Sequence, residues 1–335
     1  MCIQSIAILH YNIALQYYYR LGGRHLMDKN FTNFIENITL TQTQSDDAKK
    51  KYTGVCEKLY DTYYSGDYDE SKKYLFGSYK TKTSIRPLTS DQDVDVLFKI
   101  PQETFDKYEA YESNGQEALL QEVRNILKEK YTTTDKIKAW GKVVLVNFSE
   151  GHHNVELLPA LELEDGTFKI PNTENGGSWD VFNPRKEIDL FEESNSNTAG
   201  LTRNLAKIIK AWAHNNTSMF YKSCKRMDDI ILFLSEIYPT GKQNTSYSKI
   251  VFDYFDYLNN RCSDEIKSYI NTAVERARKA LAYEDNEQLK EASEEWRKIF
   301  GNEFPIIEEN PKRENKSESI SPNPIRPWSN SMIQK

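Results

Sequence analysis

The sequence predicts an α/β protein in which a lobe with a mixed sheet is followed by a helical C-terminal lobe. Strand patterns rich in Val, Leu and Phe end the stretch 76–100 and recur at residues 142–148 and 154–160. Apolar residues spaced three and four apart predict helices in the same lobe, at 45–64 and 103–129. Beyond residue 200 the patterns are helical, at 201–214, 248–258, 264–283 and 286–300.

The predicted helices carry signals at their ends or along one face. Ser45 is expected to cap the 45–64 helix, and Gly301 is expected to end the last helix. The 103–129 segment has an apolar stripe that should pack on the sheet: Leu119, Leu120, Val123, Ile126 and Leu127. The inward face predicted for the 201–214 helix consists of Leu201, Leu205, Ile208, Ile209 and Trp212.

The stretch 76–100, FGSYKTKTSIRPLTSDQDVDVLFKI, combines a Gly77-Ser78 turn with a strand that carries Asp93 and Asp95. Side chains alternate along a strand, so the two carboxylates share one face, where their repulsion is unfavourable unless a cation offsets it. Mg²⁺ prefers such oxygen ligands together with substrate phosphates. Gly77 would let the backbone approach a phosphate, and the Ser78 hydroxyl could donate to it. An edge strand with a solvated acidic face, beside an ordinary turn, is the structural alternative.

These motifs resemble a known family. Gly77-Ser78 followed by Asp93-Val94-Asp95 resembles the signature of DNA polymerase β-like nucleotidyltransferases, and GSYKTKTSIRPL with DVDVLFKIP resembles the cGAS/DncV-like nucleotidyltransferases, or CD-NTases. The resemblance spans roughly Lys29 to Pro305. It implies a polymerase β-like lobe with a mixed sheet and a helical C-terminal lobe, bridged by a long N-terminal spine helix.

The resemblance also implies further site residues. Glu156, three residues before Pro159, occupies the place of the family's third acidic metal ligand, which is usually Asp. Lys210 matches a lysine that faces the triphosphate, and Ser223 matches a serine near the nucleotide, although a longer polar insertion follows it here. A lone strand carboxylate and a solvated lysine remain the structural alternatives for Glu156 and Lys210. The predicted catalytic and metal-binding residues are therefore Asp93, Asp95 and Glu156, and the predicted substrate-binding residues are Gly77, Ser78, Lys210 and Ser223.

By this resemblance the protein would join nucleoside triphosphates, ATP and/or GTP, into a cyclic oligonucleotide messenger for bacterial antiphage defence (CBASS). Two Mg²⁺ ions, replaceable by Mn²⁺, would assist the transfer and the release of pyrophosphate. A cyclic dinucleotide such as cyclic di-GMP or cyclic GMP-AMP is the expected product, and it would diffuse to a downstream effector. Three alternatives remain open: a linear nucleotidyltransferase acting on RNA or protein, a non-catalytic nucleotide-binding relative, and a structural interaction protein.

Composition argues against several other classes of protein. A net charge of −6 over 335 residues argues against stable nucleic-acid binding. The four cysteines show no CxxC spacing, which favours reduced thiols and a cytoplasmic location over zinc or disulfides. The apolar N-terminal run is interrupted by His10, Asn12 and Gln16, so no membrane span is expected.

The predicted boundaries are an N-terminal extension at 1–26, the nucleotidyltransferase lobe with its spine at 27–190, the helical lobe at 191–306 and a disordered tail at 307–335. His152 and His153 are expected in a solvated loop without a catalytic role. Trp179 is interpreted either as a base-stacking residue or, preferably, as packing at the rim.

Overall fold

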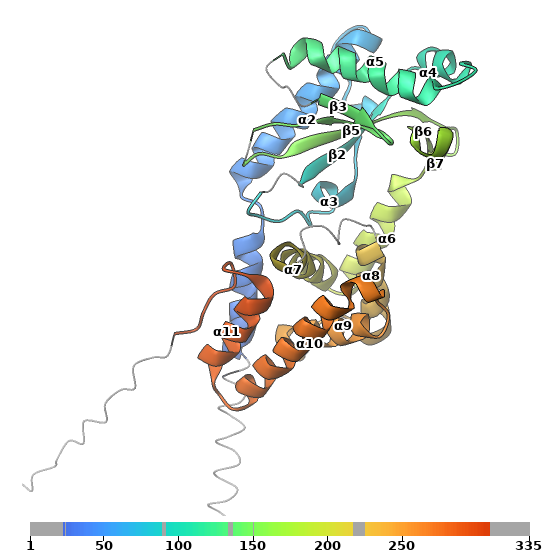
Figure 1. Ribbon diagram of the computed structural model, residues 1–335. Coiled ribbons are helices and arrows are strands. Elements are labelled where there is room, and N and C mark those ends of the chain that lie inside the picture. The colour runs from blue at the N-terminus through green and yellow to red at the C-terminus, as the bar shows by residue number, and fades with distance from the viewer. Residues whose placement is uncertain are drawn as a thin grey trace, which may run out of the picture.

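The computed structural model describes residues 23, 25–88, 92–132, 137–149, 151–216 and 225–308. It shows a sheet-containing lobe above a helical lobe, with two successive helices running along one side of both (Figure 1). The predicted mixed α/β class is confirmed. Most of the predicted N-terminal extension and nearly all of the predicted tail lie outside the described residues.

The sheet is mixed. Within the described residues, seven strands form it, in the order β1-β2-β5-β4-β3, with β6 paired to β5 and β7 to β6. The β2–β5 pair is parallel and the remaining pairs are antiparallel. The strands are β1 (Lys73–Leu75), β2 (Asp93–Lys99), β3 (Ile137–Trp140), β4 (Val143–Val146), β5 (Asn154–Glu162), β6 (Phe168–Asn172) and β7 (Ser178–Phe182). The sequence analysis did not predict β3, a short strand that pairs with β4.

Helices cover one face of this sheet (Figure 1): α2 (Gln42–Tyr63), α4 (Gln102–Glu109) and α5 (Gly115–Lys130). The predicted apolar stripe of α5 is buried there, together with Val94, Val96 and Phe98 of β2. The alternation predicted for β2 is therefore present, and Asp93 and Asp95 belong to the other face of the strand. The four-residue helix α3 (Gly77–Lys80) packs beside β2.

The helical lobe has its own aromatic core, which includes the predicted inward residues of α7. Phe31 from the helix at residues 25–38 packs edge-on against Trp296, with 5.2 Å between ring centroids. Gly301 ends the last helix at φ +85°, as predicted. The helices of this lobe are α6 (Pro184–Asn197), α7 (Leu201–Asn216), α8 (Lys225–Ile237), α9 (Tyr247–Asn259), α10 (Asp264–Asp285) and α11 (Leu289–Phe300).

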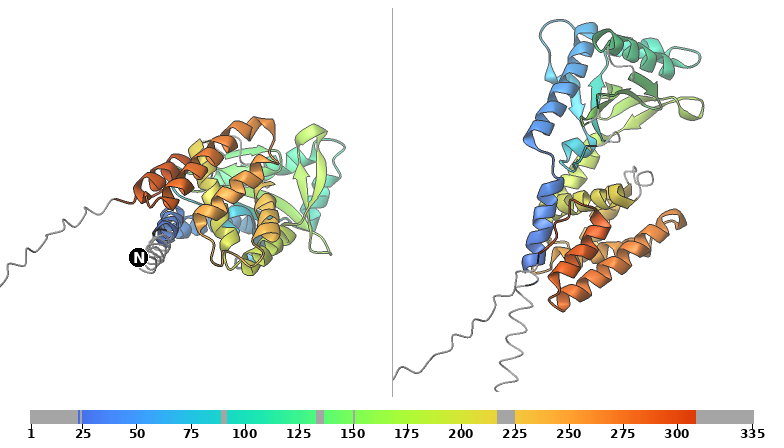
Figure 2. Two further views of the ribbon diagram at one scale, coloured as in Figure 1. Left: turned by 90° about the horizontal axis from the view of Figure 1, so that it is seen from below. Right: turned by 60° about the vertical axis from the view of Figure 1, so that its left-hand side comes forward.

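The spine that joins the lobes is two helices rather than one (Figure 2). Residues 25–38 pack into the core of the helical lobe, whereas α2 packs into the core between the sheet and its covering helices. Between them, Thr39 leaves the helical path and forms an isolated bridge with Ile85. The chain therefore changes direction where the two lobes meet.

The predicted N-cap of α2 is wrong. Thr41, not Ser45, caps the helix: its hydroxyl accepts a hydrogen bond from the Gln44 amide, and the Gln44 side chain accepts one from the Thr41 amide. This reciprocal pair satisfies two amides that a helix start otherwise leaves open. Ser45 already lies inside the helix, where its hydroxyl donates to the Thr41 carbonyl at 3.1 Å.

None of the helices in the described part of the chain is long and apolar enough to cross a bilayer.

The capping assignment can be tested by stability. Thr41→Ala should lower the free energy of unfolding by about 1 kcal/mol because the capping box is lost. Ser45→Ala should change it by less than about 0.5 kcal/mol, since the Ser45 hydroxyl is not needed for the cap. Urea denaturation followed by circular dichroism measures both, and an equal loss in the two variants would contradict the assignment.

Candidate active site

Two neighbouring strands bring the predicted carboxylates together. Asp93 and Asp95 lie on the same face of β2, and the parallel register places Asp95 directly opposite Glu156 of β5. All three acidic residues are largely enclosed and keep some exposed surface, whereas Val94 and Val96 on the opposite face of β2 are fully buried. The structure thus places Glu156, which only the resemblance had indicated, beside the Asp-x-Asp pair.

The Gly77-Ser78 turn contacts the same carboxylate. Gly77 has φ +63°, and a Cβ atom there would overlap Oδ2 of Asp95. The Ser78 amide donates a hydrogen bond to the Asp95 side chain, and the Phe76 amide donates to the Asp95 carbonyl at 3.2 Å. Glycine is therefore required at position 77 both for its backbone angle and for this close approach.

A cluster of hydroxyl groups supports the turn from within. Thr81 donates to the Gly77 carbonyl at 3.0 Å, and its hydroxyl lies 3.1 Å from that of Thr83. The Ser78 and Ser84 hydroxyls are 3.0 Å apart. Thr81, Thr83 and Ser84 are buried. The sequence analysis did not identify this cluster. The concentration of hydroxyl residues in Thr81-Lys82-Thr83-Ser84 is the sequence feature that could have indicated it.

The surroundings of Asp95 disfavour its charged form. Burial, and then repulsion from Asp93, raise the pKa of Asp95 to about 7, although Lys210 and the Ser78 amide act in the opposite direction. Lys210 reaches this region from α7 and donates to the Thr83 hydroxyl at 3.1 Å. Lys210 therefore contacts the hydroxyl cluster that supports the turn, and it is close enough to Asp95 to lower the pKa of that carboxyl.

The donor set suits a hard cation. Carboxylate oxygens are the ligands that Mg²⁺ prefers, and a bound cation would favour the ionised form of Asp95. Among the residues that the structure describes, no group of three or more His, Cys, Asp or Glu side chains is arranged to hold a metal ion by itself. Mg²⁺ commonly uses one or two carboxylates and completes its coordination with water and substrate phosphates, so the residues fit this cation in combination with a nucleotide.

Two other predictions have different outcomes. Trp179 packs against Phe105, with ring centroids 4.7 Å apart, which agrees with rim packing. Ser223 lies within 217–224, outside the described residues.

The prediction of a solvated loop is correct for His152 and wrong for His153. His152 is exposed and forms an ion pair with Asp47 at 2.9 Å. His153 is fully buried, its ring packs edge-on to Tyr79 of α3, and neither ring nitrogen has a hydrogen-bond partner within the described residues. Burial lowers the pKa of His153 to about 4. His153 immediately precedes β5, whose first residue is inside the fold, and this long-range packing overrides the local loop signal.

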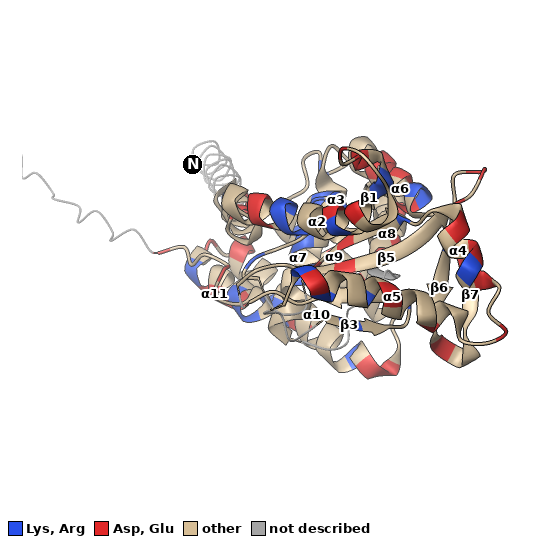
Figure 3. Cartoon of the chain, turned by 90° about the horizontal axis from the view of Figure 1, so that it is seen from above, with Lys and Arg blue, Asp and Glu red and all other residues tan. Residues whose placement is uncertain are grey.

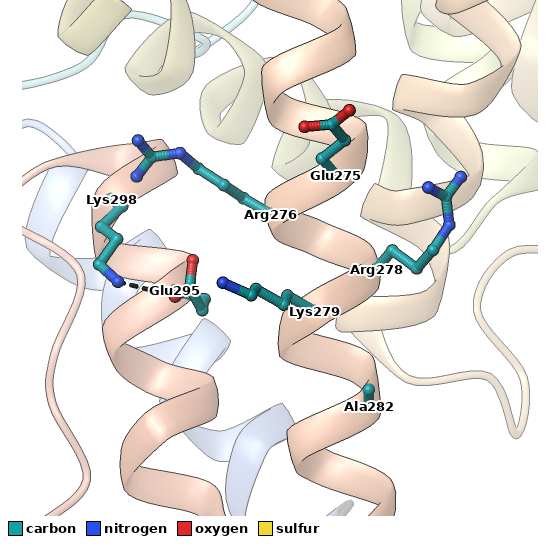
Figure 4. A pocket seen from close by; sticks show the side chains of 7 residues that line it. All are labelled: Glu275, Arg276, Arg278, Lys279, Ala282, Glu295 and Lys298. Carbon is teal, nitrogen blue, oxygen red and sulfur yellow. Dashed lines mark hydrogen bonds and ion pairs between the residues drawn. The ribbon is translucent and has the colours of Figure 1, made fainter.

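A separate recess of about 630 Å³ lies between α10 and α11 (Figure 4). It contains none of the predicted site residues, and its lining carries both signs of charge, so we do not assign the nucleotide site to it. The lining residues are Glu275, Arg276, Arg278, Lys279, Ala282, Glu295 and Lys298.

The buried histidine predicts acid sensitivity. Because the folded-state pKa of His153 is about 4, below the ordinary 6.5, the unfolded chain binds more protons between these values. Stability should therefore fall as the pH falls from 6.5 to 4, by at most about 3 kcal/mol from this group. His153→Phe should flatten this part of the stability profile, measured by urea denaturation at several pH values.

His152→Gln is the matched control, because its exposed ion pair contributes little to stability. An acid profile that His153→Phe leaves unchanged would argue against a buried neutral imidazole.

Comparison with known proteins identifies related sequences. The sequence pattern of the Second Messenger Oligonucleotide or Dinucleotide Synthetase (SMODS) domain matches residues 26–195. A probable cyclic nucleotide synthase of Bacillus cereus strain VD146 is 25% identical over 280 residues, which are 70% of this chain and 82% of that protein.

Two solved structures share the fold. CdnC of Escherichia coli MS115-1, solved with ATP, aligns with a TM-score of 0.55 and 17% identity over 83% of this chain and 98% of its own. The Vibrio cholerae DncV cyclic AMP-GMP synthase, solved with the linear intermediate 5′ pppA(3′,5′)pG, aligns with a TM-score of 0.57 and 15% identity over 91% of this chain and 92% of its own. The predicted resemblance to CD-NTases is confirmed. Because the SMODS pattern covers half of the sequence, the chain belongs to this family of cyclic oligonucleotide synthases and is a nucleotidyltransferase of the cGAS/DncV type.

Proposed function

We propose that this nucleotidyltransferase uses Mg²⁺ to join ATP and/or GTP into a cyclic dinucleotide, such as cyclic di-GMP or cyclic GMP-AMP, that acts as a messenger in antiphage defence. The observation that carries the proposal is the placement of Asp95 opposite Glu156, beside Asp93 and against the Gly77-Ser78 turn. We place the activity in the cytoplasm on the strength of the cysteine pattern. The messenger would act on a separate effector after diffusing from the enzyme.

The carboxylates have a defined task in this proposal. Asp93, Asp95 and Glu156 would hold Mg²⁺, which supplies charge neutralisation for the phosphates and lowers the pKa of an attacking hydroxyl. A bound cation would favour the ionised form of Asp95, and the ionised carboxylate would accept the proton of the attacking ribose hydroxyl.

The turn and α7 would bind the triphosphate. The backbone at Gly77 carries no side chain to obstruct a phosphate, and the Ser78 hydroxyl is available to donate once it turns from Ser84. Lys210 would exchange its contact with Thr83 for a phosphate oxygen, which offsets negative charge. Attack of one hydroxyl on an α-phosphorus forms the new phosphodiester and releases pyrophosphate.

Formation of a ring requires this transfer twice on the same two nucleotides. The name of the Bacillus cereus relative and the linear intermediate in the Vibrio cholerae structure support this sequence of steps. The net charge of −6 favours small nucleotides over a polymer acceptor. Both signs of charge also occur along α2 and α5, on the helix-covered side of the sheet (Figure 3).

The contact between Gly77 and Asp95 yields a first test. Gly77→Ala should reduce turnover on the order of 100-fold, because the added Cβ displaces a carboxylate that must be precisely placed. Gly66→Ala is the matched control: Gly66 has φ +88° with nothing within 4 Å, so its backbone strain comes without a clash. Equal loss of activity in both variants would show that backbone strain alone accounts for the effect.

Product analysis tests the function itself. Purified protein is incubated with all four labelled NTPs and Mg²⁺, with Mn²⁺ in parallel, then treated with phosphatase and examined by mass spectrometry. We expect a phosphatase-resistant cyclic product that is lost by at least about 100-fold in Asp93→Asn/Asp95→Asn, since the cation site is removed. The exposed Asp61→Asn variant should retain activity. Linear extension of an added acceptor without a cyclic product would contradict the proposal.

A further inference from the structure

Three basic residues on α7 point toward the sheet-containing lobe. Arg203, Lys207 and Lys210 are spaced four and three apart, so they share one face of the helix. Arg203 Nε donates to the Thr81 carbonyl at 2.9 Å, Lys207 Nζ to the Thr39 hydroxyl at 2.9 Å, and Lys210 Nζ to the Thr83 hydroxyl at 3.1 Å. Of these three residues, the sequence analysis assigned a role only to Lys210.

Two of these contacts lie in segment 81–86, at Thr81 and Thr83, and the third lies at Thr39 of the spine. Thr81 closes α3 through its bonds to the Gly77 carbonyl, and Ile85 forms the bridge with Thr39. The Arg86 amide then donates to the Ile38 carbonyl at 2.8 Å. Segment 81–86 therefore connects the Gly77-Ser78 turn to the break in the spine, and α7 contacts it directly at Thr81 and Thr83 and indirectly through Thr39.

Arg203 also contacts the helix that precedes α7. Its Nη2 atom lies 2.9 Å from both carboxylate oxygens of Glu192 on α6. With the guanidinium fixed in this way, its Nε–H is directed at Thr81. A continuous chain of contacts runs from Arg203 through Thr81 and Gly77 to the Asp95 carboxylate.

Lys207 is unusual because it is only 7% exposed. Burial, followed by repulsion from Arg203, lowers its pKa. Among the described residues, no carboxylate forms an ion pair with Lys207. Its ammonium donates a hydrogen bond to the Thr39 hydroxyl, which in turn donates to the Ile35 carbonyl at 2.6 Å. A buried ammonium is unfavourable for stability, so its presence at the lobe junction indicates a role other than stabilising the fold.

We propose that Arg203 and Lys207 are positioning residues that fix the Gly77-Ser78 turn for triphosphate binding. They act through segment 81–86 and do not touch the substrate. This inference rests on the proposed function, because the turn is taken to bind the nucleotide. It assigns to α7 a role in orienting the turn as well as the direct substrate contact predicted for Lys210.

The test separates nucleotide binding from turnover. Arg203→Gln and Lys207→Met should each weaken binding of a non-hydrolysable ATP or GTP analogue, measured by titration calorimetry, by about tenfold, the effect of losing one charge-assisted hydrogen bond. KM should rise by a similar factor with a smaller change in kcat. Arg203→Lys keeps the charge without the forked geometry, so it should restore binding only in part.

A double-mutant cycle examines the Lys207 contact directly. If Lys207 acts through Thr39, the effects of Lys207→Met and Thr39→Val on analogue binding should not add in the double variant. Additive effects would show that Lys207 does not act through this hydroxyl.

Arg185→Gln is the matched control for Arg203. This substitution removes the ion pair between Arg185 and Glu162, whose atoms are 2.6 Å apart. Because this pair lies outside segment 81–86, the affinity for the nucleotide analogue should be unchanged. A purely structural role would lower the melting temperature and the active fraction, and hence kcat, without changing analogue affinity. Wild-type affinity in Arg203→Gln and Lys207→Met would overturn the inference and leave the proposed function intact. Absence of binding by the wild-type protein would overturn both.

Discussion

The repulsion between the Asp93 and Asp95 carboxylates is the unfavourable interaction that the rest of the sheet-containing lobe must offset. Two carboxylates on one face of a strand, with burial raising the pKa of Asp95 to about 7, are unfavourable in the absence of a cation. The opposite face of β2 offsets that cost, because Val94, Val96 and Phe98 are fully buried beneath α2 and α5. The alternation of side chains along β2 thus places the two carboxylates on one face and, on the other face, the apolar residues that hold the strand in the core.

Local periodicity was sufficient to predict the faces of β2 and the apolar stripes of α5 and α7, since each depends on neighbours within one element. Pairing across the sheet was not predictable in this way. Glu156 lies more than sixty residues from Asp95 along the chain, and nothing local indicates that β2 and β5 run parallel with these two residues in register. Resemblance to a family supplied that long-range information, as it did for Lys210.

The incorrect predictions have physical causes. Ser45 is a residue type that commonly caps helices, yet Thr41 and Gln44 satisfy each other's amides and begin the helix one turn earlier. His153 looked like part of a polar turn, but its ring is enclosed by packing near α3. The sequence does not distinguish Arg203 and Lys207 from solvated residues of an amphipathic helix, since Thr81 and Thr39, which they contact, lie more than one hundred residues earlier in the chain.

The position of these contacts explains why the spine is divided. An uninterrupted helix would keep the amide and carbonyl groups of residues 38–41 within its own ladder. Instead, Thr39 bridges Ile85, and the Ile38 carbonyl accepts from the Arg86 amide, so the spine is joined to the segment that follows the Gly77-Ser78 turn. Lys207 docks on the same threonine from the helical lobe. The contacts at Thr39 therefore link the helical lobe to segment 81–86, which reaches Gly77 through the Thr81 hydroxyl and, beyond Gly77, the Asp95 carboxylate.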